Sequence, residues 1–258
     1  MFSKLSDFEK CTILMGNFLG DGSYDNRGSV LTSRHTIKQN KYVKWLEYLY
    51  DNMGVLHSVR YNYASPSNIN PNARSSKVKA KVPIKTFFEN ANFLRYSNNK
   101  YTKTGNRTYY KKSTKIISEY ALRNIHPMGL LLWFLDDGSL SVKRRLKKDG
   151  SQHGVQRQAI LCTHCFTYDE HITIEKVFRE RFGIEIRIHN HKSKNPVTKQ
   201  VSSTGVHTYI NATNFRNFYD VVRPYLHFIP DNMKYKFNMK YEINKVKNSK
   251  YLMENYNC

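Results

Sequence analysis

The sequence predicts an α+β fold built from two related halves. Two short apolar segments of helical character, LMGNFLGDG and LLLWFLDDG, each end in an aspartate followed by glycine. These aspartates, Asp21 and Asp137, are 116 residues apart (137 − 21), which is close to half of the 258-residue chain. Each segment is followed by elements in the same predicted order. We therefore expect two αββαββα repeats, the first over residues 1–122 and the second over residues 123–258.

The first predicted helix carries signals for its start, its packing and its end. Ser6 and Glu9 form a capping box at its N-terminus. Gly16 and Gly20 lie four residues apart on one helix face, where each glycine costs about 1 kcal/mol relative to alanine. This cost predicts that another helix approaches that face closely. Gly22 suits the left-handed conformation that ends many helices.

Alternating and β-branched segments predict the strands of the first repeat. They cover residues 29–36, 55–63 and 76–82, and the last of these places lysines on one face and small or apolar residues on the other. An amphipathic helix over residues 41–50 separates the first two strands, and Gly54 is suited to its C-terminal end.

The second repeat follows the same order. Its helix starts with proline at the first position, where the missing N–H would have no partner. The predicted elements are a helix from Pro127 to Asp137, a basic segment at 139–146, a strand at 159–166, a helix at 168–182 closed by Gly183, strands at 184–189 and 207–210, and a helix at 214–224.

The composition points to a polyanionic partner. The chain has 42 Lys plus Arg against 20 Asp plus Glu, which gives a formal net charge of +22. A membrane is disfavoured as the partner, because no apolar run approaches the roughly 20 residues that a span needs and no signal-peptide pattern opens the sequence.

Cysteine usage indicates an intracellular, reducing compartment. The chain has 4 cysteines, too few for a disulfide framework in a chain of this length. Cys162 and Cys165 have a metal-like spacing, but a closed zinc site needs four convergent ligands and the surrounding run is expected to be a buried strand. The richness in Lys, Asn, Tyr and Ile suggests an AT-rich genome, such as that of an organelle or a phage, so a mitochondrial matrix or a bacterial cytoplasm would fit.

The paired aspartates suit a divalent cation. An Asp at a helix C-terminus faces carbonyls of partial negative charge, so two such ends brought together would repel unless a proton or a cation lay between them. Mg²⁺ takes one or two carboxylates together with water and phosphate oxygens, which suggests metal-assisted attack of water on phosphodiesters. Asp-Gly is also an ordinary turn sequence, and the residues alone leave both interpretations open.

Both segments resemble the LAGLIDADG motif of homing endonucleases and intron maturases. In the first copy, four residues match the first, third, eighth and ninth letters of the motif: Leu14, Gly16, Asp21 and Gly22. The second copy keeps Leu130, Asp137 and Gly138. It departs from the motif at Leu132, which replaces the small third residue, and at Asp136 in the seventh position. This departure argues against the ideal glycine-to-glycine contact, though not against the catalytic position, and predicts an asymmetric helix contact.

Two further segments extend the resemblance over most of the chain. The run from Lys115 to Ser118 is similar to the family's Lys-x-Ile-Pro segment, with serine in place of proline. The run ending in Lys236 is similar to its Met-x-Tyr-Lys segment. Lys115 follows Asp21 by 94 residues (115 − 21), and Lys236 follows Asp137 by 99 (236 − 137), which is consistent with equivalent places in two repeats.

The resemblance implies a saddle of antiparallel sheets over DNA, with the two motif helices packed at the centre. Asp21 and Asp137 would lie above the minor groove and hold Mg²⁺, with Mn²⁺ as the expected substitute. The carbonyls of Gly20 and Asp136 would be additional ligands. By the same analogy, two lysines, Lys115 and Lys236, would polarise water or stabilise charge on phosphate. Plain contact with the DNA backbone is the alternative for these lysines.

Exposed strand positions are the candidates for reading DNA, because strands in the major groove present every second side chain to the bases. Arginine suits guanine, whereas lysine more often contacts phosphate; a solvated sheet surface is the alternative for each position. The candidates are Arg34, Arg60, Lys77, Lys79, Lys81, Lys143, Arg145, Arg157, Arg187 and His189.

The leading hypothesis is a monomeric, Mg²⁺-dependent endonuclease that cuts double-stranded DNA at a long, non-palindromic site, as an intron-encoded homing endonuclease would. The first alternative is a maturase that binds the RNA of its host intron on the same fold. A second alternative is a non-catalytic DNA-binding regulator, which would have no use for both acids and both lysines.

Overall fold

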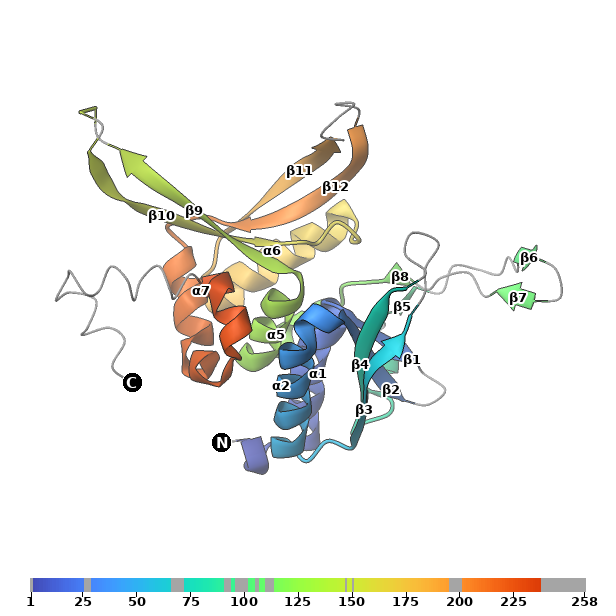
Figure 1. Ribbon diagram of the computed structural model, residues 1–258. Helices are drawn as coiled ribbons and strands as arrows, with labels where there is room; N and C mark the ends of the chain where they lie inside the picture. The colour runs from blue at the N-terminus through green and yellow to red at the C-terminus, as the bar shows by residue number, and fades with distance from the viewer. Residues whose placement is uncertain are drawn as a thin grey trace.

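The computed structural model confirms an α+β architecture with two antiparallel four-stranded sheets (Figure 1). The structure describes residues 2–25, 29–65, 72–90, 94–95, 102–104, 107–109, 114–146, 148–149, 151–194 and 201–237. Within these ranges, no helix combines the length and the apolar character that crossing a membrane requires.

The secondary structure falls into three consecutive groups. The N-terminal elements are the 3-10 helix η1 (Phe2–Lys4), helix α1 (Asp7–Leu19), strands β1 (Gly22–Asp25) and β2 (Val30–Thr36), the 3-10 helix η2 (Ile37–Gln39), helix α2 (Asn40–Asn52), strands β3 (His57–Ala64) and β4 (Arg74–Lys81) and helix α3 (Phe87–Asn90). The connecting elements are β5 (Leu94–Arg95), β6 (Thr102–Thr104), β7 (Arg107–Tyr109), β8 (Thr114–Lys115) and α4 (Glu119–Asn124). The C-terminal elements are α5 (Pro127–Asp137), β9 (Gly138–Leu146), β10 (Gln152–Leu161), α6 (Tyr168–Phe182), β11 (Ile186–Lys194), β12 (Val201–Ile210), α7 (Phe215–Val222) and the 3-10 helices η3 (Arg223–Phe228) and η4 (Asp231–Phe237).

The two sheets share one topology. Their strand orders are β1-β2-β4-β3 and β9-β10-β12-β11, and every pair of neighbours is antiparallel. In each case a helix, α2 or α6, connects the second strand to the third, and a motif helix, α1 or α5, precedes the first strand. The predicted α-β-β-α-β-β order is therefore present twice.

Helices α1 and α5 pack against each other at the centre of the molecule (Figure 1). A Cβ added at Gly16 would lie 1.7 Å from the carbonyl oxygen of Gly129, so the two backbones touch at this point. The two helices meet at a pair of glycines that occupy unequal places in the two motifs, so the contact has the expected asymmetry. Gly129, one position before the second motif's first residue, supplies the glycine that position 132 does not.

Several predicted helix ends are confirmed. The Ser6–Glu9 capping box is formed, and Pro127 occupies the first turn of α5. Gly54 and Gly183 adopt φ of 62° and 63° after α2 and α6. These residues stop their helices without the steric cost that a Cβ would bring.

Two local predictions are wrong. Gly22 does not adopt a left-handed conformation but begins β1, because α1 already ends at Leu19 with Gly20 as its C-cap. A Cβ on Gly22 would lie 2.6 Å from the carbonyl oxygen of Asn17, so a close approach explains this glycine. The expected strand at 159–166 ends at Leu161, and the following residues turn toward α6.

Aromatic side chains anchor both motif helices in the core. Trp133 of α5 is fully buried and meets the rings of Phe166 and Phe178 edge-on, with centroids 6.5 and 6.3 Å away. Phe18 of α1 meets Phe88 in the same way at 5.2 Å. This packing holds the C-terminal ends of α1 and α5, on which the acidic residues lie, in fixed positions.

Candidate active site and nucleic-acid interface

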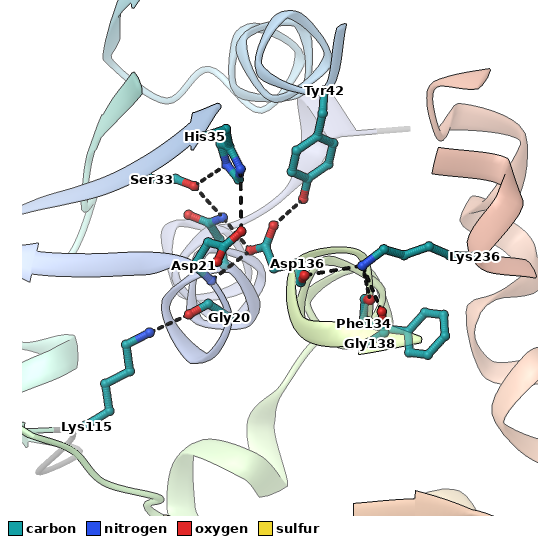
Figure 2. A network of polar contacts seen from close by, with 11 residues as sticks. Gly20, Asp21, Ser33, His35, Tyr42, Lys115, Phe134, Asp136, Gly138 and Lys236 are labelled. Atoms are coloured by element: carbon teal, nitrogen blue, oxygen red, sulfur yellow. Dashed lines mark hydrogen bonds and ion pairs between the residues drawn. The ribbon is translucent and has the colours of Figure 1, made fainter. Parts of the chain in front are cut away.

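The C-terminal ends of α1 and α5 bring two acidic residues together (Figure 2). A Cβ on Gly20 would lie 2.4 Å from the Cβ of Asp136, so only glycine leaves room for this side chain. The Asp136 carboxyl reaches the backbone N–H of Asp21, which donates to its Oδ2 at 3.4 Å. The glycine at position 20 therefore serves a cross-repeat contact as well as helix packing.

Asp136 is held on both oxygens. The hydroxyl of Tyr42 in α2 donates to Oδ1 at 2.7 Å, and the amide of Asn17 in α1 donates to Oδ2 at 2.8 Å. Burial and the charge of Asp21 raise the pKa of Asp136 to about 8, against the opposing effect of the Tyr42 hydrogen bond. In the absence of a cation, the carboxyl is therefore largely protonated at neutral pH.

His35 of β2 faces Asp21 from the other side. Its side chain is buried, its Nε2 lies 2.6 Å from the Ser33 hydroxyl, and its Nδ1 lies 3.4 Å from Asp21 Oδ2. Burial lowers the pKa of His35, although the charge of Asp21 opposes this shift. One ligand atom each from Asp21, His35 and Asp136 lies within 4.8 Å of the other two.

The two lysines each contact the end of one motif helix. Lys115 of β8 donates to the carbonyl of Gly20 at the end of α1. Lys236 of η4 is 7% exposed and donates to the carbonyls of Gly138 at 2.8 Å and Asp136 at 3.2 Å. These ammonium groups neutralise the partial negative charge of carbonyls that lack helical partners.

Asp137 lies at the same site but outside the group formed by Asp21, His35 and Asp136. Burial and the charge of Asp21 raise its pKa to about 6, while Lys115 and Lys236 lower it. Burial also lowers the pKa of Lys115. Among the neighbouring charges that oppose this shift, the charge of Asp137 has the largest effect. The backbone carbonyl of Asp137 accepts a hydrogen bond from the Cys162 N–H at 3.0 Å.

The structure thus brings together the residues that the sequence singled out and adds others. Asp21, Asp136, Asp137, Lys115 and Lys236 converge on the ends of α1 and α5. The carbonyls of Gly20 and Asp136, expected as ligands, accept hydrogen bonds from the two lysines.

Sequence reasoning missed Asn17, Tyr42 and His35. The sequence signal for His35 was present, because it alternates with Leu31 and Ser33 on the inward face of a predicted strand. Two polar residues on a buried strand face need partners, and such a pattern can mark a site. Asn17 and Tyr42 gave no comparable signal.

The outer face of the first sheet carries the predicted basic residues. In β4, Lys77, Lys79 and Lys81 alternate with buried residues, and α2 packs on the opposite face. Arg34 and Arg60 lie opposite Lys77 in the register of β2 and β3. The candidate residues of this sheet therefore share one surface.

A β-bulge adds a tyrosine to this surface. Arg60 pairs with Lys77 and Tyr63 pairs with Ser75, so β3 has one more residue than β4 between these pairs. The extra residue turns Tyr63 onto the basic face. Its ring centroid lies 5.8, 5.3 and 5.1 Å from the charged groups of Arg34, Arg60 and Lys77.

In the second sheet, Arg187 and His189 are exposed and share one face of β11. His189 packs edge-on against Tyr209 of β12, with ring centroids 4.9 Å apart. Arg157 is partly buried in β10 opposite Val142, and the strand register places it on the other face of the sheet, with the buried Ala159, so its prediction as a DNA contact on this surface is wrong. Lys143 and Arg145 pair through their backbones with Gln156 and Gly154, and their side chains lie outside the described part of the structure.

The fold resembles that of a known nuclease. The homing endonuclease I-WcaI, solved bound to its DNA recognition sequence, superposes with a TM-score of 0.58 at 20% sequence identity, over 90% of this chain and 86% of that chain. At this level of identity the match demonstrates a common fold.

Two curated relatives also match. Protein RecA of Mycobacterium shimoidei is 24% identical over 189 residues, 71% of this chain and 38% of that protein. Protein RecA of Mycolicibacterium flavescens is 23% identical over 239 residues, 90% of this chain and 47% of that protein. The chain spans less than half the length of these relatives, so the likeness concerns a part of each.

The profile of the LAGLIDADG DNA endonuclease family matches residues 11–208, from within α1 to within β12. This range contains most of α1, all of α5, seven complete strands of the two large sheets and most of β12. With the repeated topology and the acidic helix ends described above, this match shows that the chain belongs to the LAGLIDADG DNA endonuclease family.

Proposed function

We propose that this chain is a site-specific endonuclease that cuts both strands of DNA by hydrolysis at the ends of α1 and α5. One observation carries the proposal: each motif helix ends in an acidic residue, and one lysine contacts each end, Lys115 at Gly20 and Lys236 at Asp136. Two equivalent sets of acid and lysine match a duplex, which has two strands to cut.

The donor atoms at this site suit a divalent cation such as Mg²⁺ or Mn²⁺. They are hard oxygens, and the charge of Asp21 raises the pKa of Asp137, so a cation would relieve this repulsion. The carboxylates of Asp21 and Asp137 and the carbonyls of Gly20 and Asp136 would hold it. When bound, the cation would supply a more acidic water and offset charge on the phosphate.

Lys115 and Lys236 place positive charge where the phosphate charge must be stabilised. Both ammonium groups are largely removed from water, and burial lowers the pKa of each. A charge in such surroundings acts more strongly on a phosphate than one in bulk water. The contact of each lysine with a helix-end carbonyl fixes its position before DNA arrives.

The basic outer faces of the sheets would hold the DNA. Arg34, Arg60, Lys77, Lys79 and Lys81 would lie on one half of the target. The second half would be held by Arg187 and His189, together with Lys143 and Arg145. Because the sequences of the two faces differ, the target should be non-palindromic, and one chain carries both halves, which favours a monomer.

The proposed repeats, residues 1–122 and 123–258, would each supply one sheet and one acid. The boundary between them falls within α4 (Glu119–Asn124). Asp21 and Lys115 then belong to the first repeat, and Asp137 and Lys236 belong to the second.

The direct test is cleavage of a randomised duplex library with Mg²⁺, read by deep sequencing. We expect one long, non-palindromic sequence to be enriched among cut ends. Asp21→Asn and Asp137→Asn should each abolish double-strand cleavage and leave DNA binding within a few-fold of the wild type. Absence of any enriched cut site with Mg²⁺ or Mn²⁺ would refute the proposal.

A further inference from the structure

We infer that Asp21, His35 and Asp136 form a second cation site, beside the proposed cleavage site, that binds a transition-metal ion through a histidine nitrogen. The inference goes beyond DNA cleavage, because it concerns metal binding by the protein without DNA. It also separates the roles of two neighbouring side chains: the carboxyl of Asp136 belongs to this second site, and the carboxyl of Asp137 does not.

The donor atoms have the spacing of a coordination shell. His35 Nδ1 and Asp21 Oδ2 are 3.4 Å apart, and one atom of each of the three side chains lies within 4.8 Å of the others. Two ligands that each bind one ion at about 2.1 Å are themselves separated by roughly 3.0–4.2 Å. The group therefore needs only small side-chain movements to close on an ion.

His35 is arranged as a metal ligand is. Its side chain has no exposed surface, and within the described parts of the structure its Nδ1 makes no hydrogen bond of normal geometry, although the side chain of Gln39 lies close enough to oppose the lowering of the His35 pKa by burial. Its Nε2 lies 2.6 Å from the Ser33 hydroxyl. A ligating histidine donates its other ring N–H to a neighbour, which fixes the ring. Ser33 is placed to accept that proton, which would leave the Nδ1 lone pair for a metal ion, with Asp21 Oδ2 3.4 Å from Nδ1 (Figure 2).

Asp136 retains room for an ion. Tyr42 and Asn17 each donate one hydrogen bond, one to either carboxylate oxygen. The backbone N–H of Asp21 is a third donor, to Oδ2 at 3.4 Å. A carboxylate has about four lone-pair positions, so these three hydrogen bonds leave capacity on Oδ1. The missing side chain at Gly20 is what allows Asp136 to lie here.

The donor set selects a class of metal. One imidazole nitrogen with two carboxylates suits Mn²⁺, Co²⁺ or Zn²⁺. Mg²⁺ prefers oxygen ligands only and keeps several waters, so it suits the oxygen donors around Asp137 better. The two neighbouring sites should therefore differ in their metal preference.

Two spectroscopic measurements on the DNA-free, full-length protein test the site. In Mn²⁺-loaded wild type, pulsed EPR should show modulation from a directly bound ¹⁴N, which changes when the protein is grown with ¹⁵N-histidine. Titration with Co²⁺ should give saturable visible absorption at one equivalent. Mg²⁺ in large excess should not displace the Co²⁺ from this site.

Substitutions assign the nitrogen. His35→Gln should remove the ¹⁴N modulation and weaken Co²⁺ binding at least tenfold. His57→Gln is the matched control, because His57 lies in the same sheet, with its Nδ1 2.9 Å from the carbonyl of Val55 and its Nε2 3.8 Å from the carboxylate of Asp51. It should change neither signal. Ser33→Ala keeps His35 as the ligand but removes the hydrogen bond that fixes its ring. We expect this substitution to weaken Co²⁺ binding by a smaller factor than His35→Gln does.

Asp137→Asn separates this inference from the proposed function. It should abolish DNA cleavage and leave the ¹⁴N signal and Co²⁺ binding intact. No ¹⁴N modulation in the wild type, or modulation that survives in folded His35→Gln protein, would overturn the second site. Either result would leave the cleavage proposal untouched, and failure of cleavage would leave the metal titration interpretable.

Discussion

The Asp136 carboxyl shows how one residue can couple the two halves of the site. It comes from α5 yet takes its hydrogen bonds from α1 and α2, through Asn17 and Tyr42. Because it is buried and lies close to the charge of Asp21, its ionised form is disfavoured unless a cation is bound. The metal-free protein therefore carries an electrostatic penalty that depends on pH.

This penalty predicts a pH-dependent difference in stability between wild type and Asp136→Asn. The pKa of Asp136 is raised to about 8 in the folded protein, against 3.8 as the ordinary value. The folded state thus binds the proton more tightly, and the stabilisation that this provides is lost as pH rises from about 4 to about 8. The loss is at most about 1.4 kcal/mol for each pH unit.

The measurement is urea unfolding in EDTA at pH 5, 6 and 7. Relative to Asp136→Asn, the wild type should lose about 1–3 kcal/mol of unfolding free energy between pH 5 and pH 7. A constant difference across this range would mean that the carboxyl is already ionised in the folded state.

At the scale of elements, the crossing of α1 and α5 fixes the distance between the two acidic ends. The backbones meet at Gly16 and Gly129, where a Cβ on Gly16 would lie 1.7 Å from a carbonyl oxygen. Neither helix can move aside without disturbing the buried aromatic rings around Trp133 and Phe18.

Gly16→Ala should therefore destabilise the protein by about 3 kcal/mol, since overpacking a tight contact forces the backbone to shift. Gly154→Ala is the matched control, because a Cβ there has nothing within 4 Å, and its effect should stay within about 1 kcal/mol. Urea unfolding followed by circular dichroism measures both. Equal effects of the two substitutions would show that the helix crossing is not tight.

Local patterns predicted most elements of this fold but not its long-range contacts. The capping box of α1, proline in α5 and the alternation in β4 are each encoded within a few residues, so the sequence revealed them. The approach of Gly129 to Gly16 depends on how two helices cross, and the contact between His35 and Asp21 depends on how β2 packs. Neither is visible in a local pattern.

The bulge in β3 was hidden for a related reason. Strict alternation would have placed Tyr63 on the same face as Tyr61, which points inward and donates to Glu47 of α2. The extra residue is Asn62, with φ of 51°, and its backbone N–H donates to the Ser76 hydroxyl. One residue in the left-handed region therefore decides which side chain reaches the basic face.

Substitutions of Asn62 should separate backbone conformation from side-chain contacts. Valine is strained at positive φ, so Asn62→Val should cost about 2 kcal/mol and weaken binding to a random-sequence duplex several-fold. Asn62→Gly permits the same backbone and should bind that duplex within about twofold of the wild type. Circular dichroism and gel-shift titration measure the two effects. Unchanged DNA binding by folded Asn62→Val would show that Tyr63 and its cations do not contact DNA.

At the scale of the whole molecule, a chain that forms two sheets of the same topology carries a formal net charge of +22. The lysines of β4 lie on the outer surface of the first sheet, opposite the face on which α2 packs. Charge of this size attracts any polyanion, so its arrangement on the sheets matters more for DNA binding than its amount.

The proposed arrangement predicts how DNA affinity responds to salt, both in the wild type and in single-charge variants. Each phosphate neutralised by the protein releases counterions and adds about 0.9 to the slope of log K against log salt concentration. With six to ten phosphate contacts, affinity for a duplex should fall by about 10³–10⁵ between 50 and 200 mM salt.

Lys79→Gln on β4 and Arg187→Gln on β11 should each reduce the slope by about 0.9 if the residue contacts a phosphate. Arg216→Gln is the matched control, because Arg216 is 87% exposed but lies on α7, which packs against α5 outside both sheets. All three remove one exposed positive charge, so a purely nonspecific attraction would change all three slopes equally. A lower slope for the two sheet variants alone, in fluorescence anisotropy titrations over this salt range, would place the DNA on the sheet surfaces.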